Sequence, residues 1–213
     1  MASCGIDKGH KTDLRCDWFD MPAYKIAEWT SPSLHGVGIT PNMVTVARTA
    51  LIGMALYALW QGNWAGFAFA TTVNYVLDTV DGYLARKYGN ETVLGDYMDH
   101  AADVGFLLGA AYVLHVRYSA FTRFPRMTVV GGLLLATLMV HAGCTQRRYR
   151  GCRPDAKDQG NTLDWLPRLC ASPDSNWACA VGVLGGYGPF LIWSLIMGKK
   201  ATGSGAVDLA AAQ

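Results

Sequence analysis

Charged side chains are scarce in this 213-residue sequence, since Asp, Glu, Lys and Arg make up 16% of it and hydrophobic residues 51%. About a quarter of the residues are charged in an ordinary soluble domain. The formal net charge of +2 is too small to indicate a nucleic-acid partner. The scarcity of charge therefore argues against a soluble domain and favours a membrane protein.

The six cysteines lack the spacing of a metal site, because no C-x2-C pair and no repeated interval occurs among them. In a reducing cytosol most of them are expected as free thiols, with a Cys144–Cys152 or Cys170–Cys179 contact as the alternative. The first forty residues also lack a continuous apolar segment. No cleavable signal peptide is therefore predicted.

Apolar residues are gathered into five runs, and a helix needs about 20 mostly apolar residues to cross a bilayer. The second and third runs reach that length when the polar helices that adjoin them are included. We therefore predict an all-α, polytopic membrane bundle with five spans. The runs are Met43–Trp60, Trp64–Leu77, Val104–Val116, Met127–Cys144 and Trp177–Gly198.

Large apolar and aromatic residues recur between positions 17 and 29, ahead of the first run. This pattern predicts a short amphipathic helix in the membrane interface, with an irregular segment packed on the bundle as the alternative. A loop is expected from Ser31 to Pro41. The predicted organisation is an N-terminal polar segment and interfacial helix (1–38), a membrane catalytic domain (39–200) and a flexible tail (201–213).

Carboxylates recur at fixed spacing in the string D-x2-D-G-x2-A-R-x8-G-x3-D-x3-D, which runs from residue 78 to residue 103. Helical periodicity places its first half on one helix face and its second half on one face of the next helix. Gly89-Asn90 is the predicted stop and turn between them, so the two helices should be antiparallel neighbours. The first face carries Asp78, Asp81, Gly82, Ala85 and Arg86, and the second carries Gly95, Asp99 and Asp103.

Four carboxylates beside hydrocarbon are unfavourable unless positive charge neutralises them. Oxygen ligands of this kind suit Mg²⁺, Mn²⁺ or Ca²⁺, whereas a lone D-x2-D pair is usually a solvated helix face. The small residues on the same faces leave a groove for a flat ligand, beside an arginine that can bind phosphate. The string therefore predicts a divalent metal site with Asp78, Asp81, Asp99 and Asp103 as ligands.

Most basic residues outside the spans lie on one side of the membrane if the N-terminus is cytosolic. Lys and Arg gather on the cytosolic side of membrane proteins. The predicted metal site then faces the cytosol.

The string resembles the signature of the CDP-alcohol phosphotransferases, also called CDP-alcohol phosphatidyltransferases (class I), which are membrane enzymes of phospholipid synthesis. Every signature position is present, and Thr40–Thr45 followed by Arg48 looks like the family's entry to its first span. The resemblance extends from about residue 38 to 144. It implies six spans, a site for two Mg²⁺ or Mn²⁺ ions (Ca²⁺ can occupy it), and a homodimer in the endoplasmic reticulum or bacterial inner membrane.

The resemblance also implies the roles of individual residues. Asp78, Asp81 and Asp99 would hold the metal ions, while Asp103 would share in the site and deprotonate the acceptor hydroxyl. The alcohol would replace CMP on the phosphorus of a CDP-linked donor. The positions implied or suggested for nucleotide contact are Gly82, Ala85, Arg86, Gly95, Asn42 and Asn74.

The donor and acceptor stay open. The short chain favours CDP-diacylglycerol and a polar alcohol, whereas the run Leu94–His100 resembles relatives that use CDP-choline or CDP-ethanolamine and diacylglycerol. His100 either touches the site or bonds a neighbouring helix. Arg147, Arg148 and Arg150 bind either a phosphorylated acceptor or lipid headgroups, or they only follow the positive-inside rule.

Two other classes also use acidic residues in membranes. An intramembrane prenyltransferase pairs aspartates with Mg²⁺ but usually needs more spans and does not require the G-x2-A-R element. A divalent cation transporter needs a path across the bilayer, whereas these carboxylates gather at one end of their helices.

Overall fold

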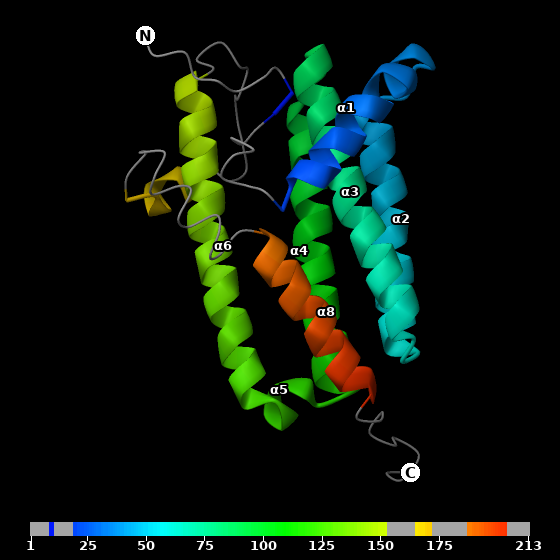
Figure 1. Cartoon of the computed structure of the whole chain (residues 1–213), viewed down its shortest axis with the longest axis vertical. Helices are drawn as coiled ribbons and strands as arrows, with labels where there is room; N and C mark the ends of the chain where they lie inside the picture. The colour runs from blue at the N-terminus through cyan, green and yellow to red at the C-terminus, as the bar shows by residue number, and fades with distance from the viewer. Residues whose placement is uncertain (1–8, 11–18, 153–164, 172–186, 204–213) are drawn as a thin grey trace.

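The computed structural model describes residues 9–10, 19–152, 165–171 and 187–203, and side chains are not described for 150–152 and 187. The described residues form helices and no strand, which confirms the all-α prediction for them (Figure 1). The helices are α1 (Met21–Gly36), α2 (Pro41–Trp60), α3 (Trp64–Tyr88), α4 (Val93–Val116), α5 (Ala120–Arg123), α6 (Pro125–Cys152), the 3₁₀ helix η1 (Leu166–Leu169) and α8 (Tyr187–Gly203).

Capping residues set the ends of the helices that carry the acidic string. The Asn63 side chain accepts a hydrogen bond from the Gly66 amide at 2.9 Å and starts α3. Gly89, with a φ of +71°, ends α3 in the left-handed conformation that favours glycine. Thr92 then accepts from the Gly95 amide at 3.0 Å and starts α4. The predicted stop at Gly89-Asn90 is confirmed.

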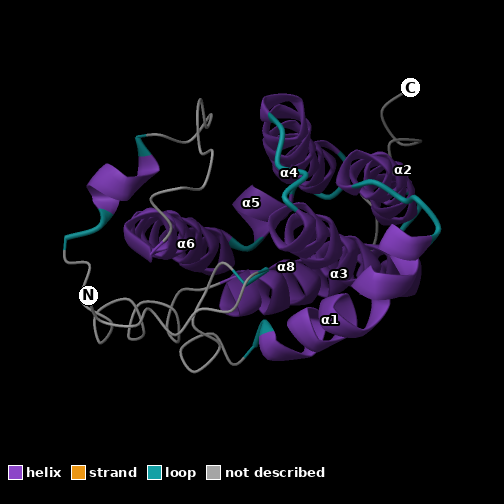
Figure 2. Ribbon diagram, turned by 90° about the horizontal axis from the view of Figure 1, so that it is seen from above, coloured by secondary structure: helices purple, strands orange, loops and turns teal. Residues whose placement is uncertain are grey.

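The long helices run roughly side by side along the molecule, while α1 lies obliquely across α3 (Figures 1 and 2). Helix α2 packs against both α3 and α4. The two helices of the acidic string run in opposite directions, as predicted, but both pack mainly on α2 rather than on each other as neighbours. The N-terminal half of α2 therefore lies beside the C-terminal half of α3 and the start of α4.

Helix α1 extends further than predicted, because it continues to Gly36 through Pro32. The predicted loop from Ser31 is therefore wrong. Ala27 and Ser31 are fully buried, and Tyr24 joins an apolar cluster with side chains of α3, so packing holds this part of α1 helical. The domain boundaries at 38, 39, 200 and 201 stay predictions.

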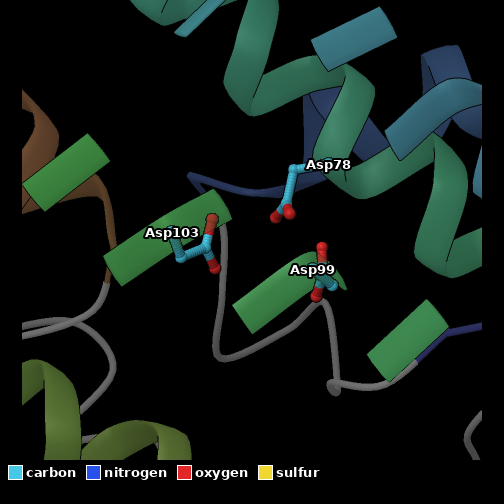
Figure 3. Close-up of side chains that lie close together, drawn as sticks. All are labelled: Asp78, Asp99 and Asp103. Carbon is cyan, nitrogen blue, oxygen red and sulfur yellow. The ribbon is translucent and has the colours of Figure 1, made fainter. Parts of the chain in front are cut away.

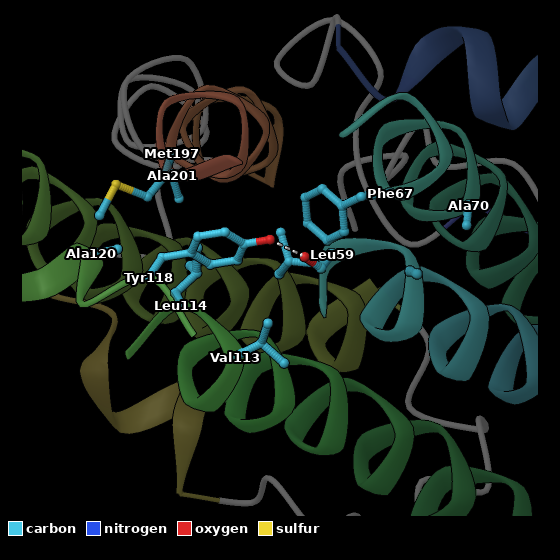
Figure 4. Close-up of a cluster of buried hydrophobic side chains, with 10 residues drawn as sticks. Leu59, Phe67, Ala70, Val113, Leu114, Tyr118, Ala120, Met197 and Ala201 are labelled. Atoms are coloured by element: carbon cyan, nitrogen blue, oxygen red, sulfur yellow. Dashed lines mark hydrogen bonds between the residues drawn. The ribbon is translucent and has the colours of Figure 1, made fainter. Parts of the chain in front are cut away.

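An apolar cluster holds the end of the bundle opposite the acidic string (Figure 4). It gathers side chains from five helices around Tyr118, which is 1% exposed and donates a hydrogen bond from its hydroxyl to the Leu59 carbonyl at 2.6 Å. The buried members are Ala55, Leu59, Phe67, Ala70, Val113, Leu114, Tyr118, Ala120, Met197 and Ala201.

A disulfide joins Cys144 of α6 to Cys170 just after η1. The prediction of free thiols is wrong for these two residues, and neither expected partner is the one that bonds. The segment containing η1 folds back on α6, where Gly143 leaves room for the Leu166 carbonyl. A Cβ on residue 143 would lie 2.3 Å from that oxygen, so only glycine permits this close approach. The close approach lets two cysteines 26 residues apart in the sequence form the disulfide.

Among the described residues, two helices are long and apolar enough to cross a membrane by length and composition: Pro41–Trp60 and Pro125–Tyr149. Only 33% and 22% of their apolar windows are buried, so most of this surface faces outward. Helices α3 and α4 carry the polar residues of the acidic string and do not meet the same criterion. The predicted five spans are therefore not established, and the first part of Trp177–Gly198 lies outside the described residues.

Replacing Tyr118 with Phe removes a buried hydrogen bond to the Leu59 carbonyl, which keeps its bond from the Gly62 amide. We expect a loss of about 0.5–1.5 kcal/mol in the free energy of unfolding. Thermal unfolding of the detergent-purified protein measures it. Tyr112→Phe is the matched control, because Tyr112 is 62% exposed. Equal stability of the two variants would contradict a structural role for the Tyr118 hydroxyl.

Candidate metal centre

Three carboxylates of the acidic string converge from α3 and α4 beside α2 (Figure 3). Asp78 comes from α3, while Asp99 and Asp103 come from successive turns of α4. Their ligand oxygens lie within 4.8 Å of one another. Because carboxylate oxygens bind hard divalent cations at about 2.0–2.6 Å, one ion can reach all three side chains.

Asp81 lies beside this group rather than within it. Its side chain is 5% exposed and faces α2, where the Thr45 hydroxyl donates a hydrogen bond to Asp81 Oδ2 at 2.8 Å. The structure thus brings together three of the four aspartates of the string. A ligand role for Asp81 stays a prediction.

Arg48 of α2 lies among the three carboxylates with its side chain fully buried. The terminal nitrogen Nη1 contacts Asp78 and lies 3.2 Å from Asp99 Oδ1. The other terminal nitrogen, Nη2, donates to Asp103 Oδ1 at 2.6 Å and to the Asp99 backbone carbonyl at 3.3 Å. A guanidinium therefore neutralises part of the negative charge.

Sequence reasoning did not assign this role to Arg48. The available signal was a basic residue inside an apolar run, which is rare unless the charge is paired. Its partners are aspartates of the string, but they lie 30 to 55 positions further along the chain, so no local spacing links them to Arg48. Only the packing of α2 on both motif helices shows the contact.

The buried side chain of Arg48 covers the centre on the side of α2, while the three carboxylates are partly exposed on the other side. The side chains of Asp78 and Asp99 are 35% and 34% exposed, and that of Asp103 is 53% exposed. Asp103 is therefore the most accessible of the three to a molecule that approaches from outside.

The donor set fits a hard divalent cation. One guanidinium against three carboxylates leaves net negative charge. In addition, Asp99 Oδ1 is buried and is held only by its ion pair with Arg48 at 3.2 Å, without a hydrogen bond that meets ordinary geometry. Oxygen-only sites with this charge suit Mg²⁺, Mn²⁺ or Ca²⁺.

Two of the predicted nucleotide residues lie together beside the centre. A Cβ built on Gly95 would lie 2.7 Å from Asn42 Oδ1 and 3.0 Å from the Thr92 hydroxyl. Gly95 therefore lets the start of α4 approach Asn42 of α2. Asn74, one turn before Asp78, is 3% exposed, and its amide oxygen has no hydrogen-bond donor.

The guanidinium of Arg86 lies over Gly82, where there is no side chain to block it. A Cβ on Gly82 would lie 2.9 Å from a terminal nitrogen of Arg86. Arg86 Nε donates to the backbone carbonyl of Gly9 at 2.8 Å. Ala85, on the same face, is half-buried. Arg86, which was predicted to bind phosphate, thus contacts the backbone of Gly9 in this structure.

The predicted acceptor residues lie outside the group of three carboxylates. His100 Nδ1 is 2.8 Å from the Asp96 carbonyl of its own helix. Arg147 donates to the Cys170 carbonyl at 2.9 Å. Arg148 is half-buried on α6, and the side chain of Arg150 is not described.

Comparison with known proteins gives one family. The model of the CDP-alcohol phosphatidyltransferase family matches residues 38–160, more than half of the chain. Two curated relatives also match, and the chain spans about half the length of each. No solved structure gives a significant match.

The first relative is the archaetidylinositol phosphate synthase of Pyrococcus horikoshii, 27% identical over 108 residues that cover 49% of this chain and 55% of that protein. The second is the CDP-diacylglycerol–glycerol-3-phosphate 3-phosphatidyltransferase of Pseudomonas fluorescens, 29% identical over 96 residues that cover 43% of this chain and 49% of that protein. Both matches are similarities over part of each protein.

Replacing Asp99 with Asn keeps the side-chain shape and removes a charged ligand from the centre. We expect the dissociation constant for Mn²⁺ to rise at least about tenfold, equivalent to about 1.4 kcal/mol of binding free energy. The electron paramagnetic resonance signal of free Mn²⁺ measures binding. Asp96→Asn is the control, because Asp96 pairs with His100 instead. Equal Mn²⁺ binding by both variants would contradict the site.

Proposed function

Because the chain belongs to the CDP-alcohol phosphatidyltransferase family, we propose that it is an integral membrane enzyme that transfers a substituted phosphate from a CDP-linked donor to an alcohol and releases CMP. The observation that carries the proposal is the convergence of Asp78, Asp99 and Asp103 within 4.8 Å at the spacing of the string. The family match favours this activity over a divalent cation transporter.

We propose that the helices α2, α3, α4, α6 and α8 span the membrane. The outward apolar surface of α2 and α6 supports this. A layer of apolar side chains on the outside of α4, including Leu108 and Tyr112, both 62% exposed, supports it as well. The distribution of basic residues favours a cytosolic face for the metal centre, in the endoplasmic reticulum or a bacterial inner membrane.

The proposed cofactors are two Mg²⁺ or Mn²⁺ ions, held by Asp78, Asp99 and Asp103 with Asp81 beside them. Bound there, they would supply the positive charge that a departing CMP requires. Arg48 positions the carboxylates from α2, and Thr45 orients Asp81 through its hydrogen bond.

Asp103 is the proposed general base. Its carboxylate is the most exposed of the three, so an acceptor hydroxyl can reach it. It would take the proton of that hydroxyl as the oxygen attacks phosphorus. Arg48, hydrogen-bonded to Asp103 Oδ1, would hold the carboxylate in place meanwhile.

We favour CDP-diacylglycerol as the donor and a phosphorylated polar alcohol as the acceptor. The name of the second relative gives CDP-diacylglycerol and glycerol 3-phosphate as its substrates, and the name of the first gives an inositol phosphate lipid. The basic residues Arg147, Arg148 and Arg150 are candidates for the acceptor phosphate. The alternative is a CDP-choline or CDP-ethanolamine donor with diacylglycerol.

The test is CMP release by the purified protein in lipid vesicles. The donors are CDP-diacylglycerol, CDP-choline and CDP-ethanolamine. The acceptors are glycerol 3-phosphate, inositol phosphate, inositol, serine and diacylglycerol, each with Mg²⁺ or Mn²⁺. We expect CMP only when donor, acceptor and metal are all present. No CMP with any combination would overturn the proposed function.

Asp103→Asn should lower the rate of CMP release at least about 100-fold, because general base catalysis contributes about 10²–10⁴-fold. Binding of CMP should change much less, since the nucleotide positions are untouched. Titration calorimetry with CMP and the release assay separate the two effects, and Asp96→Asn serves as the control. Unchanged turnover would remove the assigned role.

Gly95→Ala should weaken donor binding, because the new Cβ would lie within 3.0 Å of Asn42 Oδ1 and Thr92 Oγ1. We expect the KM for the CDP-linked donor to rise at least about tenfold, a change of about 1.4 kcal/mol. Gly105→Ala is the matched control on the same helix, since a Cβ there meets nothing within 4 Å. A donor KM unchanged in Gly95→Ala would contradict nucleotide contact at this position.

A further inference from the structure

We propose that Arg48 is a counter-cation that competes with the divalent metal for the carboxylates of Asp78, Asp99 and Asp103, and so sets the metal affinity of the centre. The inference rests on the proposed function, because it presumes that these side chains bind a metal ion. Arg48 acts through the carboxylates and is therefore a positioning residue.

The contacts of Arg48 support competition rather than remote influence. One nitrogen contacts Asp78 of α3 and lies 3.2 Å from Asp99 Oδ1, while the other lies 2.6 Å from Asp103 Oδ1. The three side chains that can share an ion are thus the three that share the guanidinium. Arg48 contacts Oδ1 of each carboxylate, so a metal ion that binds any of these Oδ1 atoms would have to loosen that contact.

Burial explains why the arginine is held there. A guanidinium with no exposed surface requires charged partners, since an isolated buried charge is strongly destabilising. The carboxylates need it equally, because like charges within 4.8 Å repel one another. The hydrogen bond from Arg48 to the Asp99 backbone carbonyl fixes the guanidinium in the gap.

One face of helix α2 contacts all four aspartates of the acidic string. Thr45 and Arg48 are three residues apart, so they share a face of α2. Thr45 donates to Asp81, and Arg48 contacts the other three aspartates. In the absence of metal this face keeps α3 and α4 at the separation that metal binding requires.

Two consequences follow for a variant that lacks the charge. Without a metal, the carboxylates repel each other and the protein loses stability. With a metal, no competitor remains and the repelled charges favour a dication more strongly. Removal of Arg48 should therefore lower the stability of the metal-free protein and raise its metal affinity, a pair of effects that loss of packing alone cannot produce.

The experiment uses the full chain in detergent, Mn²⁺ as the only ligand and Arg48→Met as the variant. We expect the dissociation constant for Mn²⁺ to be at least about tenfold lower than in the wild type. The electron paramagnetic resonance signal of free Mn²⁺ measures it. The melting temperature in EDTA should fall, and the rise on adding Mn²⁺ should exceed that of the wild type. Arg126→Met, at an exposed arginine, should change neither quantity.

Arg48→Lys keeps the charge but not the planar fork, and it provides a second variant if Arg48→Met does not fold. Its Mn²⁺ affinity should lie between those of the wild type and Arg48→Met. Wild-type or weaker affinity in either folded variant, or equal losses of melting temperature in EDTA and Mn²⁺, would overturn the inference.

The outcomes separate this inference from the proposed function. Mn²⁺ binding that Asp99→Asn removes and Arg48→Met leaves unchanged would overturn the role of Arg48 alone. Absence of Mn²⁺ binding in the wild type and in both Arg48 variants would overturn the metal centre and this inference with it.

Discussion

Negative charge beside an apolar helix bundle is the constraint on which the rest of this structure depends. Three carboxylates within 4.8 Å need a cation, and Arg48 of α2 provides one from a fully buried position. This requirement explains why α2 packs on both motif helices. The first helix of the matched region is thus part of the site, although it contributes no acidic residue.

The opposite end of the bundle is held by apolar packing. There the apolar cluster around Tyr118 packs α2, α3, α4 and α8 together, and Tyr118 donates a hydrogen bond to the Leu59 carbonyl. Firm packing at one end allows the helices to hold a polar gap at the other. Positions on rigid helices suit groups that must keep a fixed geometry during catalysis.

The sequence predicted what local spacing controls. The helical faces of the acidic string, the stop at Gly89 and the proximity of three aspartates all follow from periodicity and capping. Contacts between distant segments could not be predicted. The placement of Arg48, the Cys144–Cys170 bond and the continuation of α1 through Pro32 depend on how separate helices pack, which no local pattern records.

The bond between Arg86 and Gly9 ties a residue of the acidic string to the beginning of the chain. Its acceptor is a backbone carbonyl, and Gly9 has a φ of +118° with its Cα against the Tyr83 ring. The neighbouring His10 is hydrogen-bonded to Glu28 on α1. The Nε of Arg86 is therefore committed to Gly9, and a ligand that drew the whole guanidinium away would break the bond that holds Gly9 against α3.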